Sequence, residues 1–182
     1  LLTVNSSVFT QEGRLPFEKQ FKQFWSSESD RPHVVFLLGW NYIMSDDLLA
    51  FYSENRVLVV NLHPALPGSY VGGNAVEQQY TDFVEGRLTD NKVGSMVHLV
   101  TGNLDRGHVI DTSRVVINSQ LVNSLEALRA LIKYYEKPLI LNSLTHLLNE
   151  YSRDGLQTLL ELGTPKYSPF YIGKVRSVTD IG

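Results

Sequence analysis

The chain of 182 residues contains no cysteine. Disulfide bonds, thiolate nucleophiles and zinc–thiolate sites are therefore excluded. The sequence also has no uninterrupted apolar run of about 18 residues, so it predicts no transmembrane helix. Its formal net charge is −3, without the basic excess that is usual in general nucleic-acid binders. These absences argue against a protein that spans a membrane or binds nucleic acid.

Two further features are missing. Residues 1–5 include no initiator methionine and no basic segment followed by an apolar one, so we expect a cytoplasmic protein that has lost residues upstream. The histidines at His33, His108 and His146 show no ligand spacing. The sequence therefore predicts no metal site.

What is present is an ordinary globular composition, with 43% hydrophobic and 19% charged residues, enough for one domain with a real core. The near-continuous apolar runs at residues 33–38 and 57–60 are typical of strands buried on both faces, as in a parallel sheet. Residues 94–100 predict a third strand. Residues 109–117 predict a fourth, antiparallel and at an edge, and a last short strand is expected near residues 174–178.

Helical spacing of apolar residues separates these strands, and it predicts helices over residues 11–25, 46–52, 74–85 and 125–148. Ser45 or Asp46 is suited to cap the second helix, and Ser124 the last one. Pro138 should kink or restart the last helix, because proline has no N–H for the i−4 bond. Alternation of helices and strands is the pattern of an α/β fold with a mostly parallel sheet.

In such sheets, ligands bind outside the carboxyl ends of the strands. Residues 39–41, 61–63 and 101–103 fall at or just past three predicted strand ends. We therefore expect a site where these three segments converge.

Three polar residues in these segments could polarise and protonate a carbonyl group under attack, namely Asn61, His63 and Asp105. Each also has a structural interpretation. Asn61 could simply terminate a strand, and Asp105 could be a turn aspartate paired with Arg106. His98 lies inside a predicted strand, so we expect a core histidine with a backbone partner.

Residues 61–70 (NLHPALPGSY) and 94–107 (GSMVHLVTGNLDRG) resemble the signature of the folate-dependent formyltransferases. The resemblance runs from about residue 33 to about residue 148, and it is weaker over 149–182. It looks most like the fungal members that formylate glycinamide ribonucleotide in purine synthesis. It implies a single domain over residues 1–182 with a Rossmann-like fold, a mostly parallel sheet flanked by helices.

The resemblance also implies roles for individual residues. Asn61 matches the asparagine that binds the formyl oxygen, His63 the catalytic histidine, and Asp105 the aspartate that positions it and a relay water. Glu136 and Pro64 match substrate-binding positions. The co-substrate implied is 10-formyltetrahydrofolate, with no metal. Its pteridine pocket would be lined by Trp40, Asn41, Tyr42, Ile43, Met44, Val100, Thr101, Gly102, Asn103 and Leu104.

The implied reaction is acyl transfer, in which Asn61 and a protonated His63 stabilise a tetrahedral oxyanion. We expect Asp105 to raise the pKa of His63 and keep its ring cationic, since a nearby carboxylate favours the charged form.

The chain also departs from the family pattern. The family begins with a strand and a loop of the Gly-Ser-Gly-Ser-Asn type that binds the substrate phosphate; this sequence has no such loop, so we expect the N-terminal part of the fold to be truncated or absent. Lys137 stands where the family usually has histidine. Asn41 and Tyr42 replace a pair that commonly includes arginine.

Other functions stay open at this point. A methionyl-tRNA formyltransferase would need a basic C-terminal domain, against which the acidic balance speaks. A formyltetrahydrofolate hydrolase, a sugar-nucleotide N-formyltransferase or an inactive scaffold subunit are further alternatives. A homodimer or larger assembly is possible.

Overall fold

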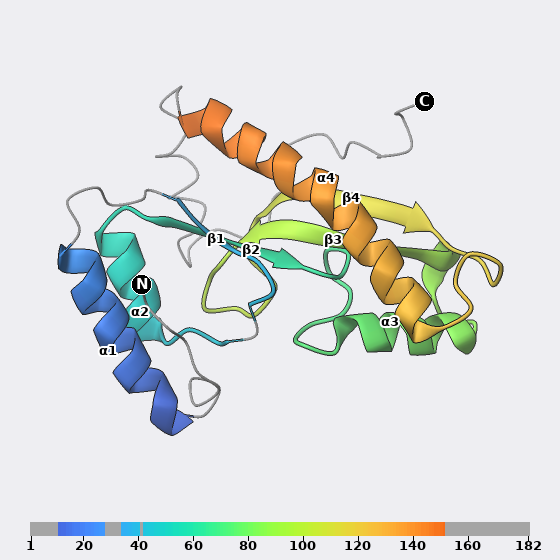
Figure 1. Ribbon diagram of the computed structural model, residues 1–182, viewed down its shortest axis with the longest axis horizontal. Helices are drawn as coiled ribbons and strands as arrows, with labels where there is room; N and C mark the ends of the chain where they lie inside the picture. The colour runs from blue at the N-terminus through green and yellow to red at the C-terminus, as the bar shows by residue number, and fades with distance from the viewer. Residues whose placement is uncertain (1–10, 28–33, 41, 152–182) are drawn as a thin grey trace.

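The computed structural model describes residues 11–27, 34–40 and 42–151. The described strands form one sheet in the order β1 (Val34–Leu37), β2 (Leu58–His63), β3 (Lys92–Leu99) and β4 (Val109–Val116). The helices that flank it are α1 (Gln11–Ser27), α2 (Asp46–Glu54), α3 (Ala75–Val84) and α4 (Leu125–Tyr151) (Figure 1). The α/β, Rossmann-like fold class is confirmed. The strand expected near residues 174–178 and the histidine at position 33 lie outside the described residues.

The described sheet is mixed, and the expectation of a mostly parallel sheet is wrong for these strands. β1 and β2 are parallel, whereas β3 runs antiparallel to both β2 and β4. The reason lies in α3, which packs beside α4 and does not carry the chain back to the start of β2. The chain re-enters the sheet beyond His63, which pairs with Met96. β4 then returns antiparallel at the edge of the sheet, as predicted.

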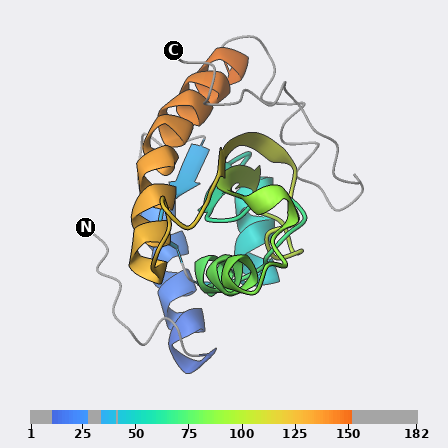
Figure 2. The same ribbon diagram turned by 90° about the vertical axis from the view of Figure 1, so that its right-hand side faces the viewer.

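The two faces of β2 serve different purposes, because successive side chains of a strand point to opposite faces. On one face, Leu58 and Val60 pack with Leu139 and Leu147 of α4. This helix runs along one side of the sheet (Figure 2). On the other face, Val57 and Val59 pack with the core formed by α1 and α2. Asn61 and His63 continue that second face beyond the apolar core.

The expected helix starts are confirmed. Ser45 accepts a hydrogen bond from the Leu48 amide at 3.1 Å and caps α2, and the Ser124 hydroxyl accepts one from the Ala127 amide, also at 3.1 Å. None of the described helices combines the length and the apolar character that a membrane span requires.

Of the two outcomes predicted for Pro138, a restart of the helix is wrong, since α4 continues through it from Leu125 to Tyr151, and a kink stays a prediction. Proline at position 138 deprives the carbonyl of Tyr134 of its helical partner. Tyr134 is 67% exposed, so this residue lies on the solvent side of the helix, where water can replace a missing backbone bond.

Candidate active site

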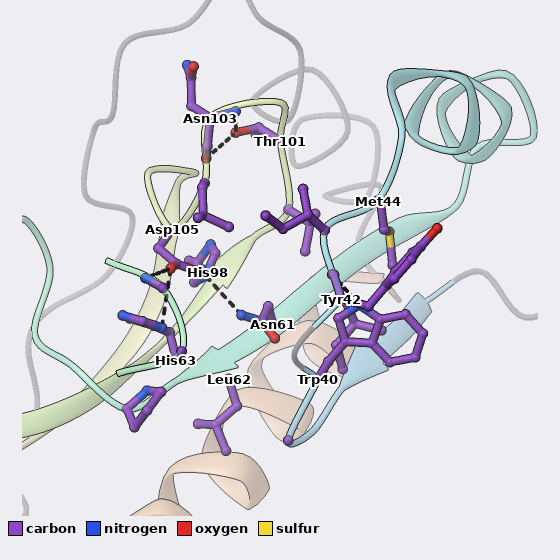
Figure 3. A pocket seen from close by; sticks show the side chains of 18 of the residues that line it. Trp40, Tyr42, Met44, Asn61, Leu62, His63, His98, Thr101, Asn103 and Asp105 are labelled. Carbon is purple, nitrogen blue, oxygen red and sulfur yellow. Dashed lines mark hydrogen bonds and ion pairs between the residues drawn. The ribbon is translucent and has the colours of Figure 1, made fainter. Parts of the chain in front are cut away.

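A cavity of about 650 Å³ lies at the carboxyl ends of β1 and β2. Apart from Asn41, which lies outside the described residues, every candidate residue identified in the sequence lines it. Figure 3 shows the aromatic side chains of Trp40 and Tyr42 on one side of Asn61, and the His63, His98 and Asp105 group on the other. The cavity therefore has an aromatic half and a polar half that meet at Asn61.

The strand register explains why these groups meet. Leu37 of β1 pairs with Asn61 of β2, and Asn61 pairs with His98 of β3, so the three residues lie level across the sheet. The predicted convergence of three segments is correct. The third segment, residues 101–103, differs from the expectation in that it follows an antiparallel strand. Residues 100–108 follow an antiparallel strand and turn back over the sheet face, so Asp105 approaches His63 from the side of β3.

The loop that carries Asp105 is shaped by local contacts. The Thr101 hydroxyl accepts a hydrogen bond from the Asn103 amide at 3.2 Å, and Asp105 adopts the left-handed conformation with φ of 52°. Gly107 makes the return possible, because a Cβ atom there would collide with the carbonyl of Leu99. The chain can pass this close to the end of β3 only as glycine.

Asp105 is buried between two histidines. Its Oδ2 atom lies 3.5 Å from His63 Nδ1 and its Oδ1 atom 3.5 Å from His98 Nε2, while the Gly72 amide donates to Oδ2 at 2.8 Å. Burial alone would raise the pKa of Asp105, but the interactions with His98, Gly72 and His63 together outweigh it and leave that pKa below its usual value. In the part of the chain that the structure describes, its ion pairs are with histidines and not with Arg106.

His63 is only 4% exposed. Its Nε2–H donates to the Tyr70 carbonyl at 2.9 Å, which fixes the proton on that nitrogen. Burial, the largest influence, lowers the pKa of His63, and neighbouring His98 lowers it further; the Tyr70 carbonyl and Asp105 act in the opposite direction without offsetting burial. The expectation of a raised pKa is therefore wrong in this structure, because burial of the ring outweighs the effect of the Asp105 carboxylate.

His98 belongs to the site, although the sequence suggested only a structural role. Its Nδ1–H donates to the Leu99 carbonyl at 2.9 Å, which confirms the predicted core histidine with a backbone partner. Its Nε2 atom, however, faces the polar group and lies 3.4 Å from Asn61 Nδ2. Only the antiparallel register places these side chains together, so no spacing in the sequence could reveal the contact.

Asn61 is the half-buried residue where the two halves of the cavity meet. Its Nδ2 faces His98 (Figure 3), and its Oδ1 atom is buried without a hydrogen-bond partner. A buried acceptor without a partner is costly. With the His98 ring proton on Nδ1, its Nε2 atom accepts from Asn61 Nδ2, which sets the orientation of the carboxamide.

The side of the cavity formed by α4 carries charged residues of both signs, the acidic Glu136 and the basic Arg129 and Lys133. Glu136 Oε1 accepts a hydrogen bond from the Ser95 hydroxyl at 3.1 Å. Burial raises the pKa of Glu136, while Ser95 and Lys133 oppose this rise. Arg129, one turn before Lys133, forms an ion pair with Glu77 that ties α4 to α3. Among the described residues, no group of three or more His, Asp or Glu side chains is placed to hold a metal ion.

Comparisons with known proteins agree with this geometry. A family model described as formyl transferase matches residues 7–144, beginning upstream of the motif-bearing region. A phosphoribosylglycinamide formyltransferase of Schizosaccharomyces pombe is 32% identical over 120 residues, which cover 66% of this chain and 56% of the relative. One from Dictyostelium discoideum is 34% identical over 96 residues, covering 51% of this chain and 46% of the relative. The chain thus spans about half the length of the curated relatives it matches.

Solved structures of formyltransferases and of a related deformylase share the fold of this chain. The crystal structure of a phosphoribosylglycinamide formyltransferase from Bacillus halodurans superposes with a TM-score of 0.60 at 26% identity, covering 74% of this chain and 62% of that one. A formyltetrahydrofolate deformylase from Pseudomonas syringae shares the fold, with a TM-score of 0.58 at 22% identity over 71% of this chain and 39% of that one. With a family match over most of its length, the chain belongs to the formyl transferase family.

Proposed function

We propose that this chain transfers a formyl group from 10-formyltetrahydrofolate to the amine of glycinamide ribonucleotide. The observation that carries the proposal is that Asn61, His63 and Asp105 line one cavity, with His63 facing Asp105 and Asn61 joined to that pair through His98. The two curated relatives from Schizosaccharomyces pombe and Dictyostelium discoideum, both called phosphoribosylglycinamide formyltransferase, support the choice of acceptor.

The division of the cavity suits two different substrates. The half around Trp40, Tyr42 and Met44 is aromatic and apolar, which favours a flat pteridine ring. The half near α4 offers Glu136 and Lys133, groups that can bind hydroxyl groups and an anion. The formyl carbon would then lie between the halves, beside Asn61.

The proposed reaction has two steps. The substrate amine attacks the formyl carbon, a carbon–nitrogen bond forms, and the formyl carbonyl becomes an oxyanion. The intermediate then collapses, the bond from this carbon to the folate nitrogen breaks, and a proton passes through water from the attacking nitrogen to the leaving nitrogen. Asn61 and His63 donate hydrogen bonds to the oxyanion, each contributing about 3–4 kcal/mol to barrier lowering.

The protonation states follow from the site. Asp105 is ionised, because its pKa lies below the usual range. His63 rests as the neutral ring with its proton on Nε2, and this N–H is the donor for the oxyanion. As negative charge develops on the substrate, it raises the pKa of the ring in the same direction as Asp105 does.

Residues 64–73 have to move before His63 can donate to the oxyanion. In the present structure the Nε2–H of His63 is engaged by the Tyr70 carbonyl. A substrate oxygen can take that proton only after the carbonyl withdraws. We propose that substrate binding shifts Tyr70 away from His63.

A transfer assay tests the proposal directly. The purified chain is mixed with 10-formyltetrahydrofolate and glycinamide ribonucleotide, and the formylated product is measured. His63→Ala should lower turnover by at least about a hundredfold, whereas His146→Ala, a histidine of α4 that does not line the cavity, should leave it unchanged. Formate release without the ribonucleotide would indicate hydrolysis instead, and undiminished transfer by His63→Ala would refute the proposed chemistry.

A further inference from the structure

We propose that Glu18 is a positioning residue that holds residues 42–45 in place and thereby sets the affinity of the aromatic half of the cavity for its ligand. This inference rests on the proposed function, since the ligand in question is the folate. Glu18 lies on α1 and is only 2% exposed. It does not itself line the cavity, so it would act through the residues that do.

The carboxylate of Glu18 is bound at three points by a segment more than 20 residues away. Its Oε1 atom accepts hydrogen bonds from the Tyr42 hydroxyl and, at 3.0 Å, from the Ser45 amide. Its Oε2 atom accepts one from the Ser45 hydroxyl. Every one of these donors belongs to residues 42–45, which carry Ile43 and Met44 of the cavity wall.

Tyr42 and Ser45, the two residues that Glu18 binds, also make hydrogen bonds beyond the two ends of this segment. Toward its start, Trp40 Nε1 donates to the Tyr42 carbonyl at 2.7 Å, so the indole position depends on where Tyr42 is held. Toward its end, the same Ser45 hydroxyl that donates to Glu18 accepts from the Leu48 amide and caps α2. Glu18 thus fixes the cavity wall between Trp40 and the first turn of α2.

The residues around Glu18 are aromatic, so apolar packing would not favour a carboxylate at this position. The α1 residues nearby, Phe17, Phe21 and Trp25, form an aromatic cluster with Tyr42 and Tyr52. Burying an ionised group among such rings is costly unless hydrogen bonds compensate it. The compensation comes from the cavity-lining segment, whose hydrogen bonds satisfy a buried acidic residue on the helix that carries these rings.

A second contact of α1, with the first turn of α2, provides a matched control. Lys22, one turn after Glu18, forms an ion pair with Asp47 Oδ2 at 2.5 Å and also donates to the Asp47 carbonyl at 3.1 Å. This pair lies at the surface and neither residue lines the cavity. Losing it weakens the attachment of α1 to α2 without touching residues 42–45.

The test compares Glu18→Gln and Glu18→Ala with Lys22→Ala in the full chain. Binding of 5-formyltetrahydrofolate is measured by calorimetry, and kcat and KM are measured for both substrates. Charged hydrogen bonds of this kind predict about a tenfold or greater rise in Kd and in KM for the folate on losing Glu18. KM for the ribonucleotide should stay within about twofold, and Lys22→Ala should bind the folate like the wild type.

Wild-type affinity for the folate in a folded Glu18→Gln or Glu18→Ala protein would overturn the inference. If Glu18→Ala fails to fold, Glu18→Gln, which keeps the side-chain volume, decides the matter. If the wild-type chain binds no folate, the proposed function fails, but hydrogen exchange still tests Glu18. The Ser45 amide, bound directly by Glu18, should exchange faster in Glu18→Gln, and unchanged exchange would refute the positioning role.

Discussion

His63 and Asp105 face each other at 3.5 Å between Nδ1 and Oδ2, with both side chains almost fully buried. A carboxylate at this distance favours the cationic ring, yet the pKa of His63 is lowered because burial dominates. The pair is therefore balanced: a small change in charge or solvent access can add a second proton to the ring, at Nδ1, while Nε2 keeps its own. This balance determines the first two predictions.

Asp105→Asn should lower turnover by about a hundredfold or more with the fold retained. The substitution removes the charge that favours protonation of His63, and it replaces an acceptor near Nδ1 by a group that can also donate. Steady-state kinetics would show the loss in kcat. Asp47→Asn, at the exposed end of another ion pair, is the control, and an equal loss in both variants would contradict a specific role for Asp105.

Stability should fall as the pH drops below about 6.5. Burial lowers the pKa of His63 and of His108, so between their folded pKa values and about 6.5 the unfolded chain binds more protons than the folded one. Protonation then favours unfolding. Urea midpoints at about pH 7.5 and 5.5 would measure the effect, and His63→Gln should reduce the difference. A midpoint that rises on acidification over this range would show the opposite sign.

Asn61→Ala should lower kcat by about a hundredfold to a thousandfold, the usual cost of removing one donor to an oxyanion. Asn61→Asp is the sharper comparison, because it keeps the shape and replaces the N–H donor by a negative charge. Both variants should bind the folate within a few fold of the wild type. Equal turnover in the wild type and Asn61→Ala would remove this residue from the mechanism.

Gly107→Ala should destabilise the fold by about 1–3 kcal/mol, because its methyl group would collide with the Leu99 carbonyl. The strain would also displace the loop that carries Asp105, so activity should fall more than stability alone explains. Gly73→Ala provides the control, since nothing lies near its added methyl group. Thermal unfolding of both variants measures this loss of stability. Similar midpoints would contradict the close approach of Gly107 to the Leu99 carbonyl.

Much of this arrangement can be predicted from the sequence, because it follows from local patterns. The alternation in β2 places Asn61 and His63 on one face, and the caps at Ser45 and Ser124 mark helix starts. The direction of β3 cannot be inferred in this way, since it depends on α3 packing beside α4. The contact between His98 and Asn61 depends in turn on that direction.

The pKa of His63 illustrates a second limit. The sequence shows a carboxylate that can raise the pKa of His63, but the opposing effect comes from burial of the ring in the folded chain. Burial is a property of the whole fold, and it outweighs the neighbouring charge here. Glu18 is a further case: an acidic residue on an otherwise aromatic helix face reveals its partners only when residues 42–45 are placed against it.

The segment over the cavity has a consequence for measured affinities. The Tyr70 carbonyl occupies the proton of His63, and the Gly72 amide occupies an oxygen of Asp105. The backbone thereby acts as an internal competitor that keeps both buried groups satisfied when no substrate is bound. Any ligand that engages His63 and Asp105 has to displace it, so its apparent dissociation constant exceeds the intrinsic one by the inverse of the fraction of molecules in which the segment has withdrawn.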